Sequence, residues 1–398
     1  MGKPLELLSD VRIVAFTTFL IGPAATQYLA DMGADVVKVE EPHRGPHERH
    51  WSGAGTFLND VSVFFLMSNR NVRSVGLDLK HPRGRQAALD LCRDADVVVT
   101  NFRPGVMERL GLGYETLREQ KPDLIYACAS GYGSDGPYSD LPGQDLLLQA
   151  ITGLPSVSGR ADGPPIAAGA AIVDQHSATL LALGILAALH RRDVTGDGER
   201  LEVTMVQAAL DLQSEALSYH LNGPGLRRSA AGLATSYHEG PYGFYEVRDG
   251  YVALSLSPMR LISEALGEPA QLASLLDPAD AFTLREEIYA ALAPLLCDHT
   301  RASLVELLRG HGVWCAPVNS WDEMPSDPVV AQLEPIQRIE HPQAGEVRVV
   351  GHPIAFASGE AAVRRTPPAL GEHTDEVLSA LGYDERMLAE LREERVVA

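Results

Sequence analysis

The first half of the chain alternates short, almost wholly apolar runs with segments of helical periodicity. Apolar runs of strand length lie at residues 11–16, 35–40, 96–100 and 124–130, and helix-like segments separate them. Strands that are apolar at nearly every position are typical of a parallel sheet covered on both faces, and their alternation with helices is typical of α/β proteins. The pattern therefore predicts a doubly wound α/β domain.

A longer apolar helix is predicted from Gln175 to Arg192, where apolar residues follow the three/four spacing and also fill the other faces. Its apolar run, from Ala178 to Leu189, is shorter than the ~20 residues that a membrane-spanning helix needs. We therefore expect the core helix of a soluble protein.

Asp174 lies immediately before this helical pattern, in the position expected for an N-cap. Taken alone, an aspartate in this position is usually a structural cap whose side chain accepts a hydrogen bond from a free backbone N–H. The positive end of the helix also favours the ionised form, and an oriented carboxylate can attack an activated acyl group. The pattern is compatible with a cap and with a reactive carboxylate.

The character of the sequence changes after residue 221. Residues 222–229 form a linker-like segment, and residues 243–257 have the alternation of a β-hairpin that turns at Asp249-Gly250. Helical patterns follow, and from Val329 we expect the chain to return to the first domain. The predicted domains are a large α/β domain at 1–221, a linker and small α+β domain at 222–328, and a return linker with the C-terminal part of the large domain at 329–398.

Composition and charge narrow the function classes. The 398 residues carry a formal net charge of -20, which argues against binding to nucleic acid or to an anionic membrane. The four cysteines, Cys92, Cys128, Cys297 and Cys315, form no CxxC or Cys/His cluster, so we expect reduced thiols and no metal site. No targeting signal is visible near the N-terminus, and we expect a cytoplasmic protein.

One glycine-rich motif has the form of a dinucleotide-binding fingerprint. Residues 131–136 read GYGSDG, which matches GxGxxG after an apolar run. Pro137 and Pro142 prevent the regular helix whose N-terminus would hold a pyrophosphate, so we reject nicotinamide and flavin binding. The motifs GxSxG, GxxxxGKS/T and HExxH are absent, which removes the main support for a serine hydrolase, a P-loop enzyme or a zincin.

Six separated segments, taken together, resemble one family. They are GPAATQYLADMGADVVKVEEP, SNRNVRSVGLDLK, NFRPGVMERLGLGYETL, GYGSDGPYSDLPGQD, DGPPIAAGAAIVD and PPALGEHTDEVL, and they span nearly the whole chain in family order. The family is the class III CoA-transferases, which includes formyl-CoA transferase, carnitine CoA-transferase and α-methylacyl-CoA racemase. The resemblance implies a nucleotide-binding-like large domain, a smaller α+β domain, and a homodimer of two ring-like chains interlocked like links.

The resemblance also implies an activity and a nucleophile. The family's nucleophilic aspartate corresponds to Asp174, whose carboxylate would attack a donor acyl-CoA thioester to form a mixed anhydride and then an aspartyl-CoA thioester. The carboxylate of an acceptor acid would reverse these steps. Coenzyme A and its acyl thioesters then act as substrates, and no metal is required.

Residues for CoA binding are carried over from the matched motifs. The segments LDLK and NFRPGVMERL contain the family's adenine and phosphate contacts, which here are Leu77, Lys80, Asn101, Phe102, Arg109 and Leu110. Arginine and lysine suit phosphates, and a local basic patch is expected from Arg70, Arg73, Arg83 and Arg85. Taken singly, each arginine is more often a solvated surface charge, and Phe102 alone would be a core residue.

Four positions depart from formyl-CoA transferase. Leu20 stands where that enzyme has a glutamine near the acyl group, and Glu41 stands where it has an arginine in the CoA site. These changes favour an acid pair other than oxalate and formate. The active-site tyrosine–glutamate pair of that enzyme corresponds to Gln144 and Asp145, which are candidate catalytic residues, although Asp145 is equally well placed to cap a helix.

Racemisation of α-methylacyl-CoA is the alternative function inside the family. It needs an acid/base pair on opposite sides of the α-carbon, but the corresponding positions are Gln144 and Ser257, which do not titrate near neutral pH. Formyl-CoA-type transferases also close a glycine-rich loop over the intermediate, and residues 237–243 occupy that place with only two glycines. A CoA-binding protein without catalysis is disfavoured by the retained Asp174. The sequence predicts an acyl-CoA:carboxylate CoA-transferase.

Overall fold

The computed structural model describes residues 3–398 of the chain. They form two compact units. The larger unit contains the residues up to 148 together with 171–209 and 333–398, and the smaller unit contains residues 149–170 and 210–332.

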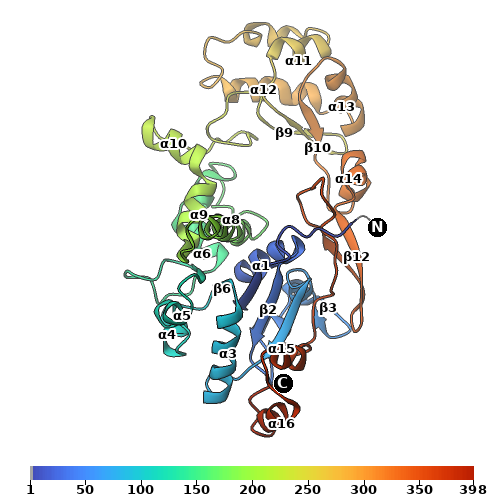
Figure 1. The fold of residues 1–398 in the computed structure, drawn as a ribbon. Helices are drawn as coiled ribbons and strands as arrows, with labels where there is room; N and C mark the ends of the chain where they lie inside the picture. Colours follow the sequence, from blue (N-terminus) through green and yellow to red (C-terminus); the bar gives the residue numbers. More distant parts are fainter. Residues whose placement is uncertain (1–2) are drawn as a thin grey trace. The chain divides into compact units, whose positions relative to one another are not determined.

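The larger unit is built on a six-stranded parallel sheet (Figure 1). Its strand order is β5-β2-β1-β6-β7-β8, and every neighbouring pair is parallel. The strands are β1 (Arg12–Phe16), β2 (Asp35–Glu40), β5 (Val72–Gly76), β6 (Val97–Thr100), β7 (Ile125–Ser130) and β8 (Glu199–Thr204). The predicted α/β class with a central parallel sheet is confirmed. The order reverses between β1 and β6, and ligands of open α/β sheets bind beyond the carboxyl ends of the strands at such a reversal.

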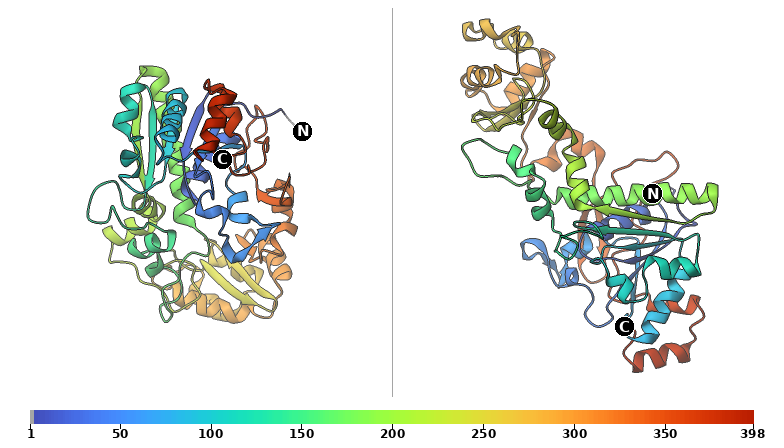
Figure 2. Two further views of the ribbon diagram at one scale, coloured as in Figure 1. Left: turned by 90° about the horizontal axis from the view of Figure 1, so that it is seen from below. Right: turned by 90° about the vertical axis from the view of Figure 1, so that its left-hand side faces the viewer.

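Helices cover both faces of this sheet (Figure 2). One face carries α1 (Ile21–Asp31) and α8 (Ile172–Thr195), and the other carries α3 (Pro82–Asp94), α15 (Thr374–Ala380) and α16 (Glu385–Glu393). The helices α2 (Val63–Leu66), α4 (Val106–Arg109) and α5 (Tyr114–Gln120) also belong to the larger unit, and α6 (Asp145–Ile151) and α9 (Met205–Leu212) begin in it. The smaller unit contains α7 (Leu154–Val157), α10 (Ser214–Asn222) and all of α14 (Pro328–Leu333) except its last residue. The short strands β3 (Phe57–Leu58) and β4 (Val61–Ser62) pair with each other, as do β12 (Ile336–His341) and β13 (Gly345–Val350).

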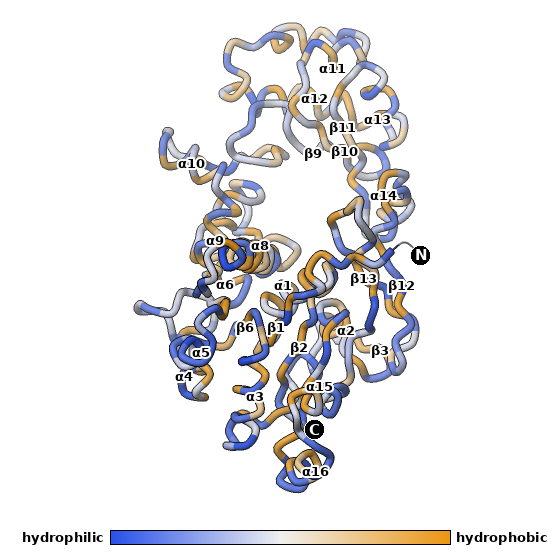
Figure 3. Tube along the Cα trace, in the orientation of Figure 1, coloured by the Kyte–Doolittle hydropathy of each residue, from blue (hydrophilic) through white to orange (hydrophobic). Residues whose placement is uncertain are grey.

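Side chains of each central strand point alternately to two buried faces. In β1, Ile13 and Ala15 join the core cluster under α1 and α8, and Val14 and Phe16 join the cluster on the opposite face. This double burial explains why the strands are apolar at successive positions, and Figure 3 shows them as hydrophobic segments. The apolar runs of the sequence therefore mark the centre of the larger unit.

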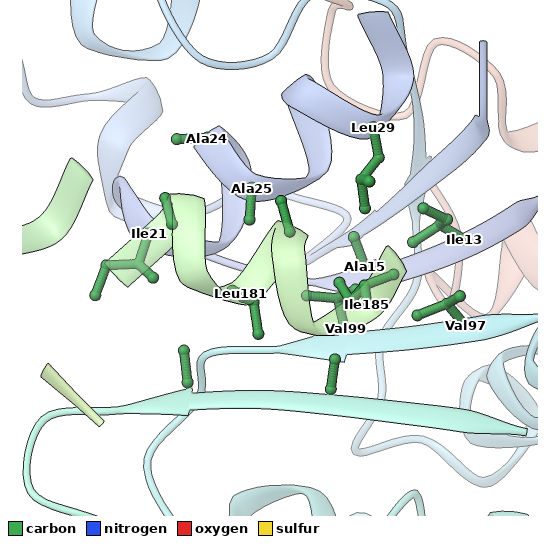
Figure 4. Close-up of a cluster of buried hydrophobic side chains, with 14 of the residues drawn as sticks. Ile13, Ala15, Ile21, Ala24, Ala25, Leu29, Val97, Val99, Leu181 and Ile185 are labelled. Atoms are coloured by element: carbon green, nitrogen blue, oxygen red, sulfur yellow. The ribbon is translucent and has the colours of Figure 1, made fainter. Parts of the chain in front are cut away.

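The long helix α8 extends three residues beyond the predicted pattern at each end. At 24 residues it is long and apolar enough to cross a membrane by length and composition alone, a test that core helices also pass. Here Leu181 and Ile185 are buried between α1 and the sheet (Figure 4), which supports a core helix. The helix ends at Gly196, whose φ of 78° is left-handed and strains any residue with a side chain.

The smaller unit contains a three-stranded antiparallel sheet in the order β11-β10-β9. The predicted hairpin is formed by β9 (Gly243–Val247) and β10 (Gly250–Leu254), with its turn at Arg248-Asp249, one position before the expected one. The third strand is β11 (Cys315–Pro317), and the helices packed on this sheet are α11 (Met259–Ala265), α12 (Arg285–Leu296) and α13 (Arg301–Gly310). Strands and helices thus lie in separate layers.

The two units divide the chain differently from the predicted domain ranges. Residues 149–170 and 210–221, which those ranges place in the large domain, belong to the smaller unit. The first of these segments is held by Arg228, whose Nη1 donates to the backbone oxygens of Ser158 at 3.3 Å and Pro164 at 3.0 Å. Contacts between residues so far apart in the chain leave no trace in local periodicity. Compactness does not test independent folding, so the domain ranges stay a prediction.

Candidate active site

Asp174 lies in the first turn of α8, at the carboxyl edge of the parallel sheet. The chain leaves β7 at this edge, and α8 leads into β8, which runs parallel to β7. A connection between parallel strands must return to the opposite edge before the next strand starts. The N-terminus of α8 therefore faces the region where doubly wound sheets bind ligands.

The N-cap residue of α8 is Ala171 and not Asp174, because the helix begins at Ile172. The N-cap position predicted for Asp174 is therefore wrong. Another element supplies the cap: Oδ2 of Asp145, the first residue of α6, accepts hydrogen bonds from the backbone N–H of Val173 at 2.8 Å and of Asp174 at 3.0 Å. Asp145 thus satisfies donors that the helix itself leaves unpaired.

The environment of the Asp174 carboxyl disfavours its charge. Burial, and to a smaller extent the negative charge of Asp145, raise the pKa of Asp174 from about 3.8 to about 7. Among residues 3–398, no donor is hydrogen-bonded to the Asp174 carboxylate oxygens. Because its own helix end is already capped, this carboxylate is available to react.

Two glycines bring Asp145 to its place beside α8. A Cβ on Gly131 would lie 2.7 Å from the Cα of Gly143, and a Cβ on Gly143 would lie 2.5 Å from the Cα of Gly131. The two backbones therefore cross with no room for any side chain. Gly131, the first glycine of the rejected dinucleotide motif, therefore serves this close approach. Gln144, next to Asp145, is exposed.

Asn101 holds the turn at the reversal of strand order. Its Oδ1 accepts from the Thr18 backbone N–H and its Nδ2 donates to the Thr18 backbone oxygen, both at 2.8 Å. Thr18 belongs to the turn between β1 and α1, while Asn101 directly follows β6. The predicted ligand residue Asn101 therefore lies at the reversal of strand order and fixes the backbone of the turn there.

Comparisons with known proteins identify the family of this chain. Residues 8–374 match the sequence model of CoA-transferase family III. The chain belongs to this family. It is 32% identical to formyl-CoA:oxalate CoA-transferase of Rhodopseudomonas palustris (strain BisA53), covering 98% of this chain and 96% of that protein. It is 30% identical to succinyl-CoA:glutarate CoA-transferase of Mus musculus, and this match covers 98% of this chain and 89% of that protein.

Solved structures show the same fold. A CAIB/BAIF family protein from Brucella suis has a TM-score of 0.82 and 27% identity, covering 96% of this chain and all of that one. Rv3272 from M. tuberculosis also has a TM-score of 0.82, with 30% identity and coverage of 94% and 99%. The resemblance to class III CoA-transferases is confirmed, and the protein is an enzyme that uses CoA thioesters as substrates.

The predicted CoA residues of this family III transferase differ in exposure. Leu77 is buried and bridges to Val397, whereas Phe102 and Leu110 pack partly buried against the same core. Lys80 and Arg109 are exposed, and neither side chain pairs with a carboxylate in the described part of the chain. These two residues can bind phosphate groups without breaking an existing ion pair.

Three of the four arginines expected to form a basic patch are already used. Their ion pairs are Arg70–Asp31, Arg73–Asp35, Arg73–Glu376, Arg83–Glu390 and Arg83–Glu394. The prediction that these three arginines form a basic patch is therefore wrong, because carboxylates neutralise their charges. Arg85 has no ion-pair partner among residues 3–398 and remains available.

Two of the four positions that depart from formyl-CoA transferase, Leu20 and Glu41, have structural roles in this chain. Leu20 is buried in the core cluster next to α1. Oε2 of Glu41 accepts from the backbone N–H groups of His43, Arg44 and Gly45 at 3.2, 2.7 and 3.2 Å. Glu41 thus closes a turn, a role that the sequence comparison did not suggest although the spacing of two to four residues is typical of such turns.

Two further predicted positions lie in the smaller unit. In the candidate closing loop at 237–243, the ring of His238 stacks on Tyr242 at a centroid distance of 4.2 Å and contacts Tyr237 in a tilted arrangement at 4.5 Å. Ser257 Oγ accepts a hydrogen bond from the Trp314 backbone N–H at 2.9 Å. The loop is thus held by ring contacts, and Ser257 fixes the backbone.

The arrangement in the larger unit suits nucleophilic chemistry by a carboxylate. Asp174 combines a fixed place at a helix terminus with a pKa near neutral pH. Residues 3–398 contain no group of three or more His, Cys, Asp or Glu side chains suited to hold a metal ion. The Asp174 carboxylate can supply an oxygen nucleophile, and Asp145 holds the backbone of Val173 and Asp174 through its two hydrogen bonds.

Proposed function

We propose that this family III transferase moves CoA from a donor acyl-CoA to an acceptor carboxylic acid through covalent intermediates on Asp174. The observation that carries the proposal is that one aspartate caps the N-terminus of α8 and a different aspartate presents a carboxylate there. Asp145 caps the helix, and the Asp174 carboxylate is left without a hydrogen-bond donor among residues 3–398. A fixed, weakly solvated carboxylate is a stronger nucleophile than one in water.

The reaction proceeds by four acyl transfers. A carboxylate oxygen of Asp174 attacks the thioester carbonyl, the C–S bond breaks, and CoA leaves as a thiolate from a mixed anhydride. The thiolate then attacks the Asp174 carbonyl carbon, which releases the donor acid and forms an aspartyl-CoA thioester. The acceptor carboxylate attacks this thioester, and the thiolate returns to the acceptor's acyl carbon. Each step replaces one acyl bond by another, so the thioester is conserved.

CoA would lie along the carboxyl edge of the sheet. We assign its binding to Leu77, Lys80, Asn101, Phe102, Arg109 and Leu110, which follow the ends of β5 and β6. The free charges of Lys80 and Arg109 would bind phosphates, and the partly buried Phe102 and Leu110 would line the nucleotide. The reversal of strand order between β1 and β6 supports this place.

We also propose a cytoplasmic, interlocked homodimer that binds neither nucleic acid nor membrane. The net charge of -20 supports the last two points. Large exposed side chains in the smaller unit, including Trp314 and Trp321, support an interface that a second chain covers. Light scattering on purified protein should give twice the mass of one chain, and a monomer would contradict the assembly.

Racemisation is the second candidate, because Asp145 and Asp174 together form a carboxylate pair. Such a pair can act as an acid/base on one side of an α-carbon. The other side would need Gln144 or Ser257, and neither titrates near neutral pH. Incorporation of solvent deuterium into a 2-methylacyl-CoA, with no acceptor acid present, would favour this candidate over transfer.

The deciding experiment uses succinyl-CoA and acetyl-CoA as donors with a panel of carboxylic acids, and identifies product thioesters by mass. Wild-type protein should transfer CoA, and Asp174→Ala and Asp174→Asn should each lose at least about 1,000-fold in kcat, because each removes the nucleophile. Hydroxylamine should trap a hydroxamate on the peptide that contains Asp174. Undiminished transfer by Asp174→Ala would refute the mechanism.

A further inference from the structure

A row of aromatic side chains is exposed on the larger unit, outside the residues discussed so far. Ring centroids are 5.7 Å apart for Phe19 and His47, 6.3 Å for His47 and Trp51, and 5.1 Å for Trp51 and Phe64. Phe19 is 45% exposed and Trp51 is 44% exposed. We name Phe19, His47 and Trp51 the aromatic row. Contiguous exposed apolar surface of this kind marks binding sites.

Buried ion pairs fix the loop that carries His47 and Trp51. Lys38 Nζ lies 3.2 Å from Glu48 Oε1, and Arg49 donates to both carboxylate oxygens of Glu40 at 2.7 Å. Lys38 and Glu40 belong to the last residues of β2, and all four side chains are buried or nearly so. Two ion pairs to β2 therefore hold the loop in place. In the sequence, His47 precedes Glu48 and Arg49, the loop residues of these pairs, and Trp51 follows them.

Hydrogen bonds to the backbone of Trp51 and to the next residue also hold Trp51 in place. Ser62 Oγ donates to the Trp51 backbone oxygen at 2.7 Å, and the Phe64 backbone N–H donates to Ser52 Oγ at 3.3 Å. The Phe64 ring meets the Trp51 ring at an interplanar angle of 72°. A large ring held in place by its surroundings loses little conformational entropy when a ligand binds to it.

Phe19 adopts a backbone conformation that a bulky residue rarely takes. Its φ is 56°, in the left-handed region, where a residue with a Cβ is strained. The neighbouring Thr18 is held by two hydrogen bonds to Asn101. Strain that is held by the surrounding structure is common at functional sites, and here it places a phenylalanine beside His47.

The aromatic row lies on the same edge of the sheet as Asp174. Phe19 comes just before α1, and Figure 4 shows α1 and α8 side by side and running in the same direction, from Ile21 and Leu181 toward Leu29 and Ile185. The first turns of both helices therefore lie at the carboxyl edge. The exposed rings and the proposed nucleophile face one region of the larger unit.

We infer that the aromatic row binds the organic part of an exchanged acid and selects acids with a flat apolar group, such as an aryl ring. This inference rests on the proposed CoA transfer at Asp174. Ring faces and edges held at fixed positions bind another ring by offset stacking or edge contacts. A saturated ring of the same carbon count is thicker and has no π-face, so it gains less from this surface.

The test compares 3-phenylpropanoate with 3-cyclohexylpropanoate, which differ only in the ring. Wild-type protein should prefer the phenyl acid in kcat/KM, and Trp51→Ala should lower that value by ~10-fold while changing the cyclohexyl acid by less than about 3-fold. Trp51→Phe should restore most of the loss because a flat ring returns. Phe57→Ala removes an equally exposed aromatic side chain of β3 outside the row, and should change neither value.

Equal losses for the two acids in Trp51→Ala, or an equal effect of Phe57→Ala, would overturn the inference. Ligand-detected NMR of the two acids with wild type and Trp51→Ala measures the same preference without turnover. Better binding of the phenyl acid to wild type, with this preference lost in Trp51→Ala, would support the aromatic row whatever the result for Asp174→Ala. Normal transfer by Asp174→Ala would refute the proposed mechanism alone. Equal binding of both acids by wild type refutes the inference alone.

Discussion

At the scale of single residues, the end of α8 is shared by two carboxylates with different tasks. The Asp145 carboxylate accepts hydrogen bonds from two backbone N–H groups in the first turn of the helix. Asp174 lies in the first turn of the helix, and its burial, together with the negative charge of Asp145, raises its pKa to about 7. Burial is the larger cause of this shift, and the charge of Asp145 adds to it.

The dependence of activity on pH follows from this pair. Only the ionised Asp174 is nucleophilic, so kcat/KM should rise with pH up to about 7 and then level off. Asp145→Asn keeps an oxygen for the cap and removes the negative charge, so the rising limb should move to lower pH. Asp140→Asn, an exposed aspartate on the same segment, should leave the limb in place. A limb unmoved in Asp145→Asn would show that Asp145 does not tune the nucleophile.

At the scale of elements, α8 shows how neighbours extend a helix that the sequence only outlines. The periodic pattern predicts Gln175 to Arg192, whereas the helix spans Ile172–Thr195. Its extra first turn depends on the cap from Asp145, which comes from α6. Its position depends on one face that packs against α1 and the sheet. Distant partners therefore determine both the start and the orientation of this helix.

Substitution of two leucines of α8 distinguishes the effect of buried packing on stability from the effect of helix propensity. Leu181 is fully buried, whereas Leu183 is 61% exposed on the same helix. Leu181→Ala should lower the free energy of unfolding by about 2–5 kcal/mol through lost burial and a cavity. Leu183→Ala should change it by less than about 0.5 kcal/mol, because alanine keeps the helix and no buried contact is lost. Urea unfolding followed by circular dichroism measures both, and equal effects would contradict the buried packing of Leu181.

At the scale of the whole molecule, a buried polar network ties the C-terminal segment to the start of the larger unit. Arg70 pairs with Asp31 on α1 at 2.6 Å and also donates to the Val350 backbone oxygen at 2.8 Å. Asn71 donates to Asp31 and accepts from the backbone N–H of Arg364 at 2.6 Å. The last part of the chain is therefore held by side chains nearly three hundred residues earlier in sequence.

Breaking this network should weaken the fold more than breaking a surface ion pair. Arg70→Ala removes the guanidinium that pairs with the buried Asp31 and leaves it the hydrogen bond from Asn71, and should cost about 3–5 kcal/mol of stability. Arg338→Ala breaks an exposed pair with Glu346, and should cost less than about 1 kcal/mol. Thermal unfolding of both variants measures the difference. Limited proteolysis should also cut the C-terminal segment faster in Arg70→Ala, and equal cleavage in both variants would contradict this role.

The fold class and the family could be predicted from the sequence because their signals are local. Runs of apolar residues on strands buried on both faces predict a parallel sheet, and six short segments in a fixed order indicate the family. The matched segment that ends at Asp174 indicated it as the candidate nucleophile, whereas its place before a helical pattern, taken alone, favoured a structural cap. Such signals need no knowledge of which distant residues meet.

Only the tertiary structure decided how these residues are used. Asp145 caps α8 from another element, Glu41 closes a turn, and Arg70 is neutralised by Asp31 on a neighbouring helix. The aromatic row joins rings from two separate loops. Hydrogen bonds, ion pairs and ring contacts act over a few ångströms in space, and spacing along the chain does not encode them. The sequence by itself determined the fold class, the family and a candidate nucleophile, and tertiary contacts determined the surroundings of that nucleophile.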